Sequence, residues 1–337
     1  MMRQPSEPKR PRLFQLEELS STCPKKQFTD PKHYLCPDGL VHAVNVALIL
    51  NQPLLLTGEP GSGKTQLAFW LAHELKLGKP LVFETKSTSL AQDLFYTYDT
   101  ISRFHAANTQ KDPIDERDYI TFQALGKAIL YANSKDDIQK ILPTSEYHPG
   151  QPQKSVVLID EIDKAPRDFP NDILNEIEQM FFKIPQMENR KVEASLDKKP
   201  IVIITSNSEK QLPAPFLRRC VFHCIDFPDK GRMEEIVQER FKNIDELNDS
   251  PKKNFYNPND QLIKKAKKIF NELLTKEMLI KKPSTSEYLD WIKAIIDMQA
   301  KVKNMSDADI LKNTLGVIVK NDEDLREAKK IVQECMK

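Results

Sequence analysis

The chain lacks any long apolar run. Its longest strongly apolar stretches, residues 41–50 and 201–204, are far shorter than the roughly 20 residues that a helix needs to cross a bilayer. The opening residues contain charges and prolines but no apolar signal core, which a secretory signal requires. We therefore expect no membrane segment and a cytoplasmic location.

An excess of charge of either sign is also missing. The 50 Lys and Arg residues balance 49 Asp and Glu residues, leaving a net charge of +1, so composition gives no argument for binding to nucleic acid or to a membrane. The five cysteines are odd in number and form no C-x-x-C pair. Cys220, His223 and Cys224 have side chains that zinc accepts, but they lie in an alternating apolar segment that favours a strand.

Glycine is scarce, and three of the glycines lie close together in the sequence. Nine residues of the 337 are glycine, and Gly58, Gly61 and Gly63 fall within six residues of one another. They belong to the pattern G-x-x-x-x-G-K-[ST], with an apolar segment before it and a helix-period segment after it, which is the context of a phosphate-binding loop. The residues expected to bind nucleotide are Gly58, Glu59, Pro60, Gly61, Ser62, Gly63, Lys64, Thr65 and Gln66.

The residue types in this loop explain its chemistry. Glycines let the backbone approach phosphate, so that successive N–H groups and the N-terminus of the next helix face the negative charge. Lys64 would reach the β- and γ-phosphates, and the Thr65 hydroxyl would ligand Mg²⁺. The expected ligands are therefore a nucleoside triphosphate, ATP, and Mg²⁺. The alternative is a glycine-rich turn that only joins a strand to a helix.

Strand-like and helix-like segments alternate over the first two thirds of the chain. The segments that predict strands are short and rich in Leu or β-branched residues, at 54–56, 81–84, 156–159, 201–204 and 221–227. Helices are predicted between and after them, at 65–77, 125–132, 171–180 and 213–219. This alternation predicts an α/β fold in which helices cover both faces of a five-stranded parallel sheet.

The remainder of the chain has a different pattern. From residue 232 onward apolar residues recur at spacings of three and four with no convincing strand, which predicts a small all-helical domain. We therefore expect an N-terminal extension at 1–33, partly disordered, an α/β domain at 34–228 and a helical domain at 229–337. The lysine cluster at 264–268 is either a docking patch for an acidic partner or, as we favour, a solvated helix face.

Two acidic residues follow the apolar run at 156–159. Asp160 and Glu161 stand where that strand ends, and in a parallel sheet this end lies beside the phosphate site. There Asp160 would bind Mg²⁺, and Glu161 would act as general base toward the attacking water. The alternative is that the pair only caps the next turn.

Polar and basic residues follow the later strand segments. Asn207 ends the run at 201–207 and has the groups needed to orient a water near the γ-phosphate, although Asn at such a position is also a common turn residue. Arg218 and Arg219 end a short helix. Adjacent arginines are usually surface charge, and these become functional only if they face the nucleotide of a neighbouring subunit.

Four segments, taken in this order, resemble AAA+ ATPases of the MoxR and dynein-related branch: residues 58–65, 158–171, 203–207 and 216–220. The resemblance covers about 34–228, and it implies a P-loop NTPase fold with the helical domain as its lid. By this resemblance Lys64 and Thr65 match Walker A, Asp160 and Glu161 match Walker B, and Asn207 matches sensor one. Arg218 and Arg219 match the arginine finger.

The resemblance also implies an assembly and a partner. A finger that acts on the adjacent protomer implies a homo-oligomeric ring, usually hexameric. Residues 93–122 resemble the insert that interrupts the second helix of this branch, and 181–185 with Val192 resemble its hairpin before sensor one. Such loops face the substrate side of the ring, but each could instead be a surface loop without a partner. The second sensor of the branch is commonly arginine, whereas the matching stretch here offers only Lys281 and Lys282.

These observations favour an ATP-hydrolysing module that remodels or activates a protein client, for which the resemblance suggests a von Willebrand factor A domain protein and a chaperone-like role. A nucleic-acid motor related to the restriction NTPases, which often prefer GTP, is the main alternative. The acidic insert at 93–122 disfavours tracking along phosphates. A nucleotide-gated scaffold with little turnover is the third hypothesis, and intact Asp160 and Glu161 argue against it.

Overall fold

The structure, a computed structural model, describes residues 30–109, 114–143, 146–207, 210–241, 256–258, 260–275, 279–302 and 305–336. The N-terminal extension predicted at 1–33 thus lies almost wholly outside the described residues. The chain divides into two compact units. One contains residues 30–236 with 284–286, and the other contains the described residues of 237–283 and 287–337. No helix within the described ranges is long and apolar enough to cross a membrane.

A five-stranded parallel sheet forms the centre of the first unit, in the order β2-β5-β8-β1-β9. Its strands are β1 (Leu54–Gly58), β2 (Leu81–Glu84), β5 (Val156–Asp160), β8 (Ile201–Thr205) and β9 (Val221–Ile225). All five were predicted from the sequence, with ends displaced by two residues or fewer. The predicted α/β fold class, with helices flanking a five-stranded parallel sheet, is confirmed.

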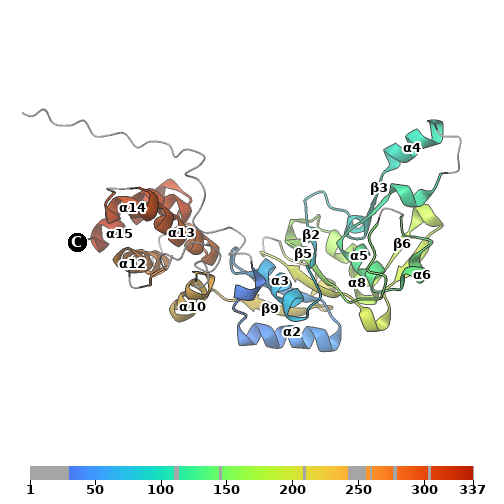
Figure 1. Ribbon diagram of the computed structural model, residues 1–337, viewed down its shortest axis with the longest axis horizontal. Helices are drawn as coiled ribbons and strands as arrows, with labels where there is room; N and C mark the ends of the chain where they lie inside the picture. The colour runs from blue at the N-terminus through green and yellow to red at the C-terminus, as the bar shows by residue number, and fades with distance from the viewer. Residues whose placement is uncertain are drawn as a thin grey trace, which may run out of the picture. The chain divides into compact units, whose positions relative to one another are not determined.

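Side chains that alternate between the two faces of the sheet divide the core of this unit into two layers. In β1, Leu54 and Leu56 face α2 (Asp38–Leu50) and α3 (Lys64–Glu74), whereas Leu55 faces the opposite layer. Successive strand side chains point to opposite faces, so a central strand must be apolar at every position. The opposite layer includes α5 (Ala124–Tyr131), α7 (Phe169–Asp172), α8 (Leu174–Gln179) and α9 (Ala214–Leu217). Figure 1 shows the sheet between these helices.

One predicted helix differs from expectation, and one helix was not predicted. The helix predicted at 171–180 is split into α7 and α8 at Ile173, which has φ −96° and ψ 0°, outside the helical minimum. The apolar run at 41–50 was noted only for its length, and it forms most of α2, with Leu40, Val44 and Ala47 buried. Those three residues are spaced by four and three, which is the period of a helix.

Two inserts share a small core of aromatic side chains. The first contains the antiparallel pair β3 (Tyr96–Tyr98) and β4 (Ile120–Phe122), with α4 (Thr100–Thr109) between them. The second is the predicted hairpin, formed by β6 (Phe181–Ile184) and β7 (Arg190–Glu193). The Phe182 ring lies 5.5 to 6.1 Å from the rings of Phe95, Tyr96 and Phe122. In Figure 1, α4 projects away from the sheet of its unit.

The second unit contains helices and no strand within its described residues, as predicted. After α10 (Lys230–Phe241), it contains α12 (Gln261–Thr275), α13 (Thr285–Lys301), α14 (Asp307–Thr314) and α15 (Asp322–Cys335). Trp291 is fully buried and donates a 2.8 Å hydrogen bond to Thr314 Oγ1. The lysine cluster lies on α12, where Lys265 pairs with Asp307 at 3.1 Å. This pairing is compatible with the solvated-face interpretation.

Candidate nucleotide-binding and hydrolysis site

The glycine-rich loop joins β1 to α3 in a conformation that only glycine adopts easily. Gly58, Gly61 and Gly63 all have positive φ, of 137°, 76° and 93°. A Cβ at position 58 would lie 2.5 Å from the carbonyl oxygen of Ile225 on the adjacent strand, so both the backbone angle and the available space require glycine. The loop therefore keeps its N–H groups close to any anion placed at the start of α3.

Lys64 is the first residue of α3, and its side chain folds back over the loop. The residue is 6 % exposed. Its ammonium donates hydrogen bonds to the carbonyl oxygens of Gly58 at 2.8 Å and Glu59 at 2.9 Å. Burial lowers the pKa of Lys64, while nearby acidic groups, with Asp163 foremost, oppose this shift. A cation is thus held inside the loop by two backbone carbonyl oxygens.

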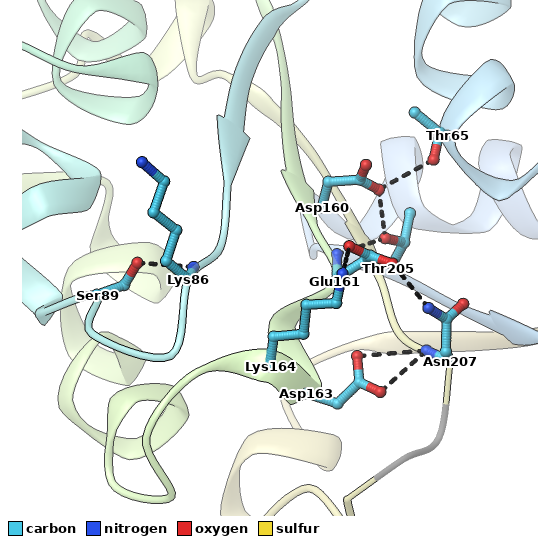
Figure 2. A network of polar contacts seen from close by, with 9 residues as sticks. All are labelled: Thr65, Lys86, Ser89, Asp160, Glu161, Asp163, Lys164, Thr205 and Asn207. Carbon is cyan, nitrogen blue, oxygen red and sulfur yellow. Dashed lines mark hydrogen bonds and ion pairs between the residues drawn. The ribbon is translucent and has the colours of Figure 1, made fainter.

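Three hydroxyl and carboxylate groups meet beside this loop, as Figure 2 shows. Oδ1 of Asp160, at the end of β5, accepts hydrogen bonds from Thr65 Oγ1 at 3.0 Å and from Thr205 Oγ1 at 2.6 Å. Thr205 is fully buried at the end of β8. The sequence had indicated Thr65 and Asp160 for metal binding, and the structure brings them together. Thr205 was missed, and its only sequence signal is its place in the polar triplet that ends a buried run.

Glu161 follows directly and has both carboxylate oxygens engaged. Its backbone is left-handed, with φ 55° and ψ 53°, and its N–H donates to Thr205 Oγ1 at 2.8 Å. Oε1 accepts a 2.9 Å hydrogen bond from the Asn207 amide, and Oε2 forms an ion pair with Lys164 (Figure 2). The predicted base and the predicted water-orienting amide are therefore neighbours.

Asp163 is a second residue that the sequence reasoning did not single out. It is only 2 % exposed, and its two carboxylate oxygens lie 3.3 and 3.2 Å from the backbone nitrogen of Asn207, which donates to them. A buried carboxylate requires such partners. The contact links the turn after β5 to the chain after β8 and fixes where the Asn207 side chain begins.

Arg218 and Arg219 lie apart from this cluster within their own chain. Both are exposed at the end of α9. Arg219 donates to Glu178 Oε2 at 2.8 Å and to the carbonyl oxygen of Pro215 at 3.1 Å. Among the described residues, neither arginine bonds to Asp160, Glu161 or Asn207, so a role in hydrolysis would have to be exerted on another copy of the chain.

The residues present fit a nucleotide and a hard divalent cation. The Ser62 hydroxyl is buried in the loop without a hydrogen-bond partner in the described part of the chain, and a bound phosphate oxygen would supply one. Thr65 and Asp160 offer oxygen ligands, and Mg²⁺ is commonly held by one or two carboxylates together with substrate phosphates. Within the described ranges, no group of three or more His, Cys, Asp or Glu side chains could hold a metal ion.

Comparison with known proteins identifies a family for the α/β unit. The family model for ATPases associated with various cellular activities (AAA) matches residues 54–228, which is more than half of the chain. None of the curated proteins matches the sequence.

Similar solved structures share little sequence with this chain. A closed-state Hsp104 structure with ATPyS and FITC casein has 18 % identity and a TM-score of 0.46, and the match covers 82 % of this chain and 48 % of that one. The RuvB Holliday junction branch migration motor of Thermotoga maritima has 15 % identity and a TM-score of 0.41, and the match covers 90 % of this chain and 72 % of that one. Domain III of the replication initiation protein DnaA of Thermotoga maritima has 11 % identity and a TM-score of 0.45, and the match covers 89 % of this chain and 99 % of that one. The chain spans about half the length of the Hsp104 chain.

Proposed function

The chain belongs to the AAA family of ATPases, and we propose that it binds ATP with Mg²⁺ and hydrolyses it to ADP and phosphate. The observation that carries this proposal is the single hydrogen-bonded cluster beside the glycine-rich loop. In it Thr65 contacts Asp160, and the adjacent Glu161 contacts Asn207. Phosphoryl transfer depends on positioning and on electrostatic stabilisation of this kind.

Each element of the loop has a distinct part in binding. The N–H groups of the loop hold phosphate oxygens, and the Lys64 ammonium exchanges its two carbonyl partners for the β- and γ-phosphates. Thr65 and Asp160 hold the cation. When bound, Mg²⁺ neutralises charge that develops on the phosphates.

Glu161 is the general base of this proposal. Each Glu161 oxygen has one partner and keeps a lone pair that can accept a proton from water, and release of one partner would leave more room for that water. The Lys164 side chain is 44 % exposed, so it can leave more easily than the Asn207 amide, whose backbone is held by buried Asp163. Asn207 then remains bonded to Glu161, where it would help to orient a water beside the carboxylate.

The exposed position of the arginines supports the proposal of a ring. Arg218 and Arg219 are exposed and do not reach the cluster of their own chain, and hydrolysis of this type gains from an arginine supplied in trans. We place this pair at the nucleotide of the neighbouring protomer in a homo-oligomer, with six subunits as the expected number. The domain limits 34–228 for the α/β domain and 229–337 for the lid are part of the same proposal.

The work done by such a ring is remodelling or activation of a protein client. The MoxR and dynein-related resemblance supports this role, with a von Willebrand factor A domain protein as the suggested client. The alternative of a nucleic-acid motor is disfavoured by the first insert. There Arg103 bonds to Glu116 at 2.8 Å and Arg117 bonds to Asp115 at 2.5 Å, so these arginines are already neutralised and offer little to a phosphate backbone.

Removal of the Lys64 ammonium tests the proposal. Lys64→Ala should lose ATP binding in calorimetry and phosphate release from ATP, because the β- and γ-phosphate charge is left without its cation. Lys79→Ala, which removes an exposed ammonium after α3, is the matched control and should behave as wild type. A Lys64→Ala protein that binds and hydrolyses ATP as the control does would contradict the assignment.

A further inference from the structure

We propose that Thr205 is a positioning residue of the hydrolytic site, because its hydroxyl both orients the Asp160 carboxylate and holds the turn that presents Glu161. The inference rests on the proposed function for the meaning of the site. The geometry is independent of that function, and it adds to the site a residue whose hydroxyl contacts Asp160 and Glu161.

Thr205 ends the central strand of the five-stranded sheet. β8 lies between β5 and β1, where Ile204 pairs with Ile159 on one side and Thr205 pairs with Leu56 on the other. Thr205 is the last residue of β8 and is fully buried. A hydroxyl at such a position must find hydrogen-bond partners, and those it finds belong to the two acidic residues at the end of the neighbouring strand.

Two hydroxyl groups fix the orientation of the Asp160 carboxylate. Thr205 Oγ1 donates to Oδ1 at 2.6 Å, and the Thr65 hydroxyl donates to the same oxygen at 3.0 Å. A carboxylate group rotates in a broad, two-fold torsion, and two donors on one oxygen remove that freedom. Oδ2 has no hydrogen-bond partner in the part of the chain that the structure describes, and it points away from Thr205 (Figure 2). The free oxygen is thus the one left for a cation or for its water.

The same Thr205 hydroxyl also holds the turn at Glu161. A residue with a β-carbon adopts the left-handed conformation reluctantly, yet Glu161 has φ 55° and ψ 53°. Its N–H donates to Thr205 Oγ1 at 2.8 Å, which compensates for this conformation. The turn directs the Glu161 side chain to Asn207. One hydroxyl therefore couples the carboxylate proposed for metal binding to the backbone of the proposed base.

Two substitutions of Thr205 distinguish the contribution of its hydroxyl from the contribution of its side-chain shape. Thr205→Val keeps the branched shape and removes the hydroxyl, whereas Thr205→Ser keeps the hydroxyl and removes a methyl group. Thr314→Val is the control, since Thr314 is buried in the helical unit and its hydroxyl also has two roles, accepting from Trp291 and donating to the Ile310 carbonyl. It loses a comparable buried hydroxyl at a position outside the site.

The readouts are the affinity for ADP, measured by calorimetry in EDTA and in Mg²⁺, and kcat and KM for ATP. For Thr205→Val we expect unchanged ADP affinity in EDTA, a loss of about 10-fold to 100-fold in the tightening that Mg²⁺ brings, and a fall in kcat of similar size, as for other residues that orient metal ligands. Thr205→Ser should recover both quantities to within about three-fold. Thr314→Val should lower the melting temperature and leave both quantities unchanged.

The contrary outcomes are distinct from a failure of the proposed function. Wild-type tightening by Mg²⁺ in Thr205→Val, or equal impairment of Thr205→Val and Thr205→Ser, overturns the role of the hydroxyl. If Thr205→Val does not fold, Thr205→Ala, which requires no additional space, takes its place under the same criteria. A wild-type protein that binds ADP with Mg²⁺ but never hydrolyses ATP contradicts the proposed function, while the binding comparison still decides the role of Thr205.

Discussion

Gly58 is the position where the glycine-rich loop has least tolerance for a side chain. Its φ of 137° is unfavourable for any L residue, and a Cβ would meet the Ile225 carbonyl oxygen at 2.5 Å. Backbone strain of this kind costs about 1–3 kcal/mol, and overpacking in a closed site costs about 1–3 kcal/mol more. Gly58→Ala should therefore lower the free energy of unfolding by about 2–6 kcal/mol, a large share of the roughly 5–15 kcal/mol of a typical domain.

Two other glycines separate the two contributions. Gly78 has φ 78°, and a Cβ at this position would have no other atom within 4 Å, so Gly78→Ala should show the backbone cost alone, about 1–2 kcal/mol. Gly126, in α5, has an ordinary helical backbone, but a Cβ there would collide with the Phe95 carbonyl oxygen. Gly126→Ala should therefore show the cost of the collision, reduced by the roughly 1 kcal/mol that alanine gains over glycine in a helix.

Urea denaturation followed by circular dichroism measures the three variants side by side. Gly58→Ala should be less stable than Gly78→Ala, because it adds a collision to the backbone cost, and its ATP affinity should fall because the loop must move to relieve the contact. A loss of stability in Gly58→Ala no greater than that in Gly78→Ala would refute the reasoning, because it would show that the loop relaxes away from Ile225 without cost.

Two more predictions concern the arginines and the first insert. Replacing both Arg218 and Arg219 by Ala should leave ATP binding intact and lower hydrolysis by roughly 10³-fold. Mixing this protein with the Lys64→Ala protein should restore some phosphate release. A mixture no more active than either variant alone would contradict action in trans. The hydrogen bonds from Arg103 and Tyr98 lower the pKa of Glu116 from its ordinary 4.5. The ionised carboxylate therefore stabilises the folded state above pH 4.5, and this stabilisation is lost as the pH falls through the lowered pKa. Glu116→Gln should thus be less stable than wild type at neutral pH in urea denaturation, with a difference that narrows as the pH falls below 4.5. A difference that does not change with pH would contradict the ion-pair account.

The parts of the fold that follow from local pattern could be predicted from the sequence. Buried strands such as β5 and β8 are short apolar runs with polar residues at their ends, and the loop at 58–65 is a contiguous motif whose glycines have physical reasons to be there. The location of Asp160 and Glu161 beside this loop was predictable because the carboxyl ends of parallel strands meet at one edge of the sheet.

Contacts that depend on tertiary structure could not be predicted in this way. Thr205 is 45 residues from Asp160 in sequence, and only the strand order makes them neighbours. The helix α4 was missed because Ile101 and Phe104 are 83 % and 70 % exposed, so it has no apolar stripe facing a core. Its local signal is the Asp99 side chain, which accepts the Ser102 N–H at 2.9 Å at the start of the helix.

The most direct test of the central claim is phosphate release by Glu161→Gln. The substitution keeps the size of the side chain and the Asn207 contact but removes the base, so ATP binding in calorimetry should match wild type while hydrolysis becomes very slow. Glu74→Gln, at the far end of α3, is the control and should hydrolyse ATP as wild type does. Slow hydrolysis with intact binding in Glu161→Gln alone is the predicted result, and comparable turnover in wild type and Glu161→Gln would contradict the account.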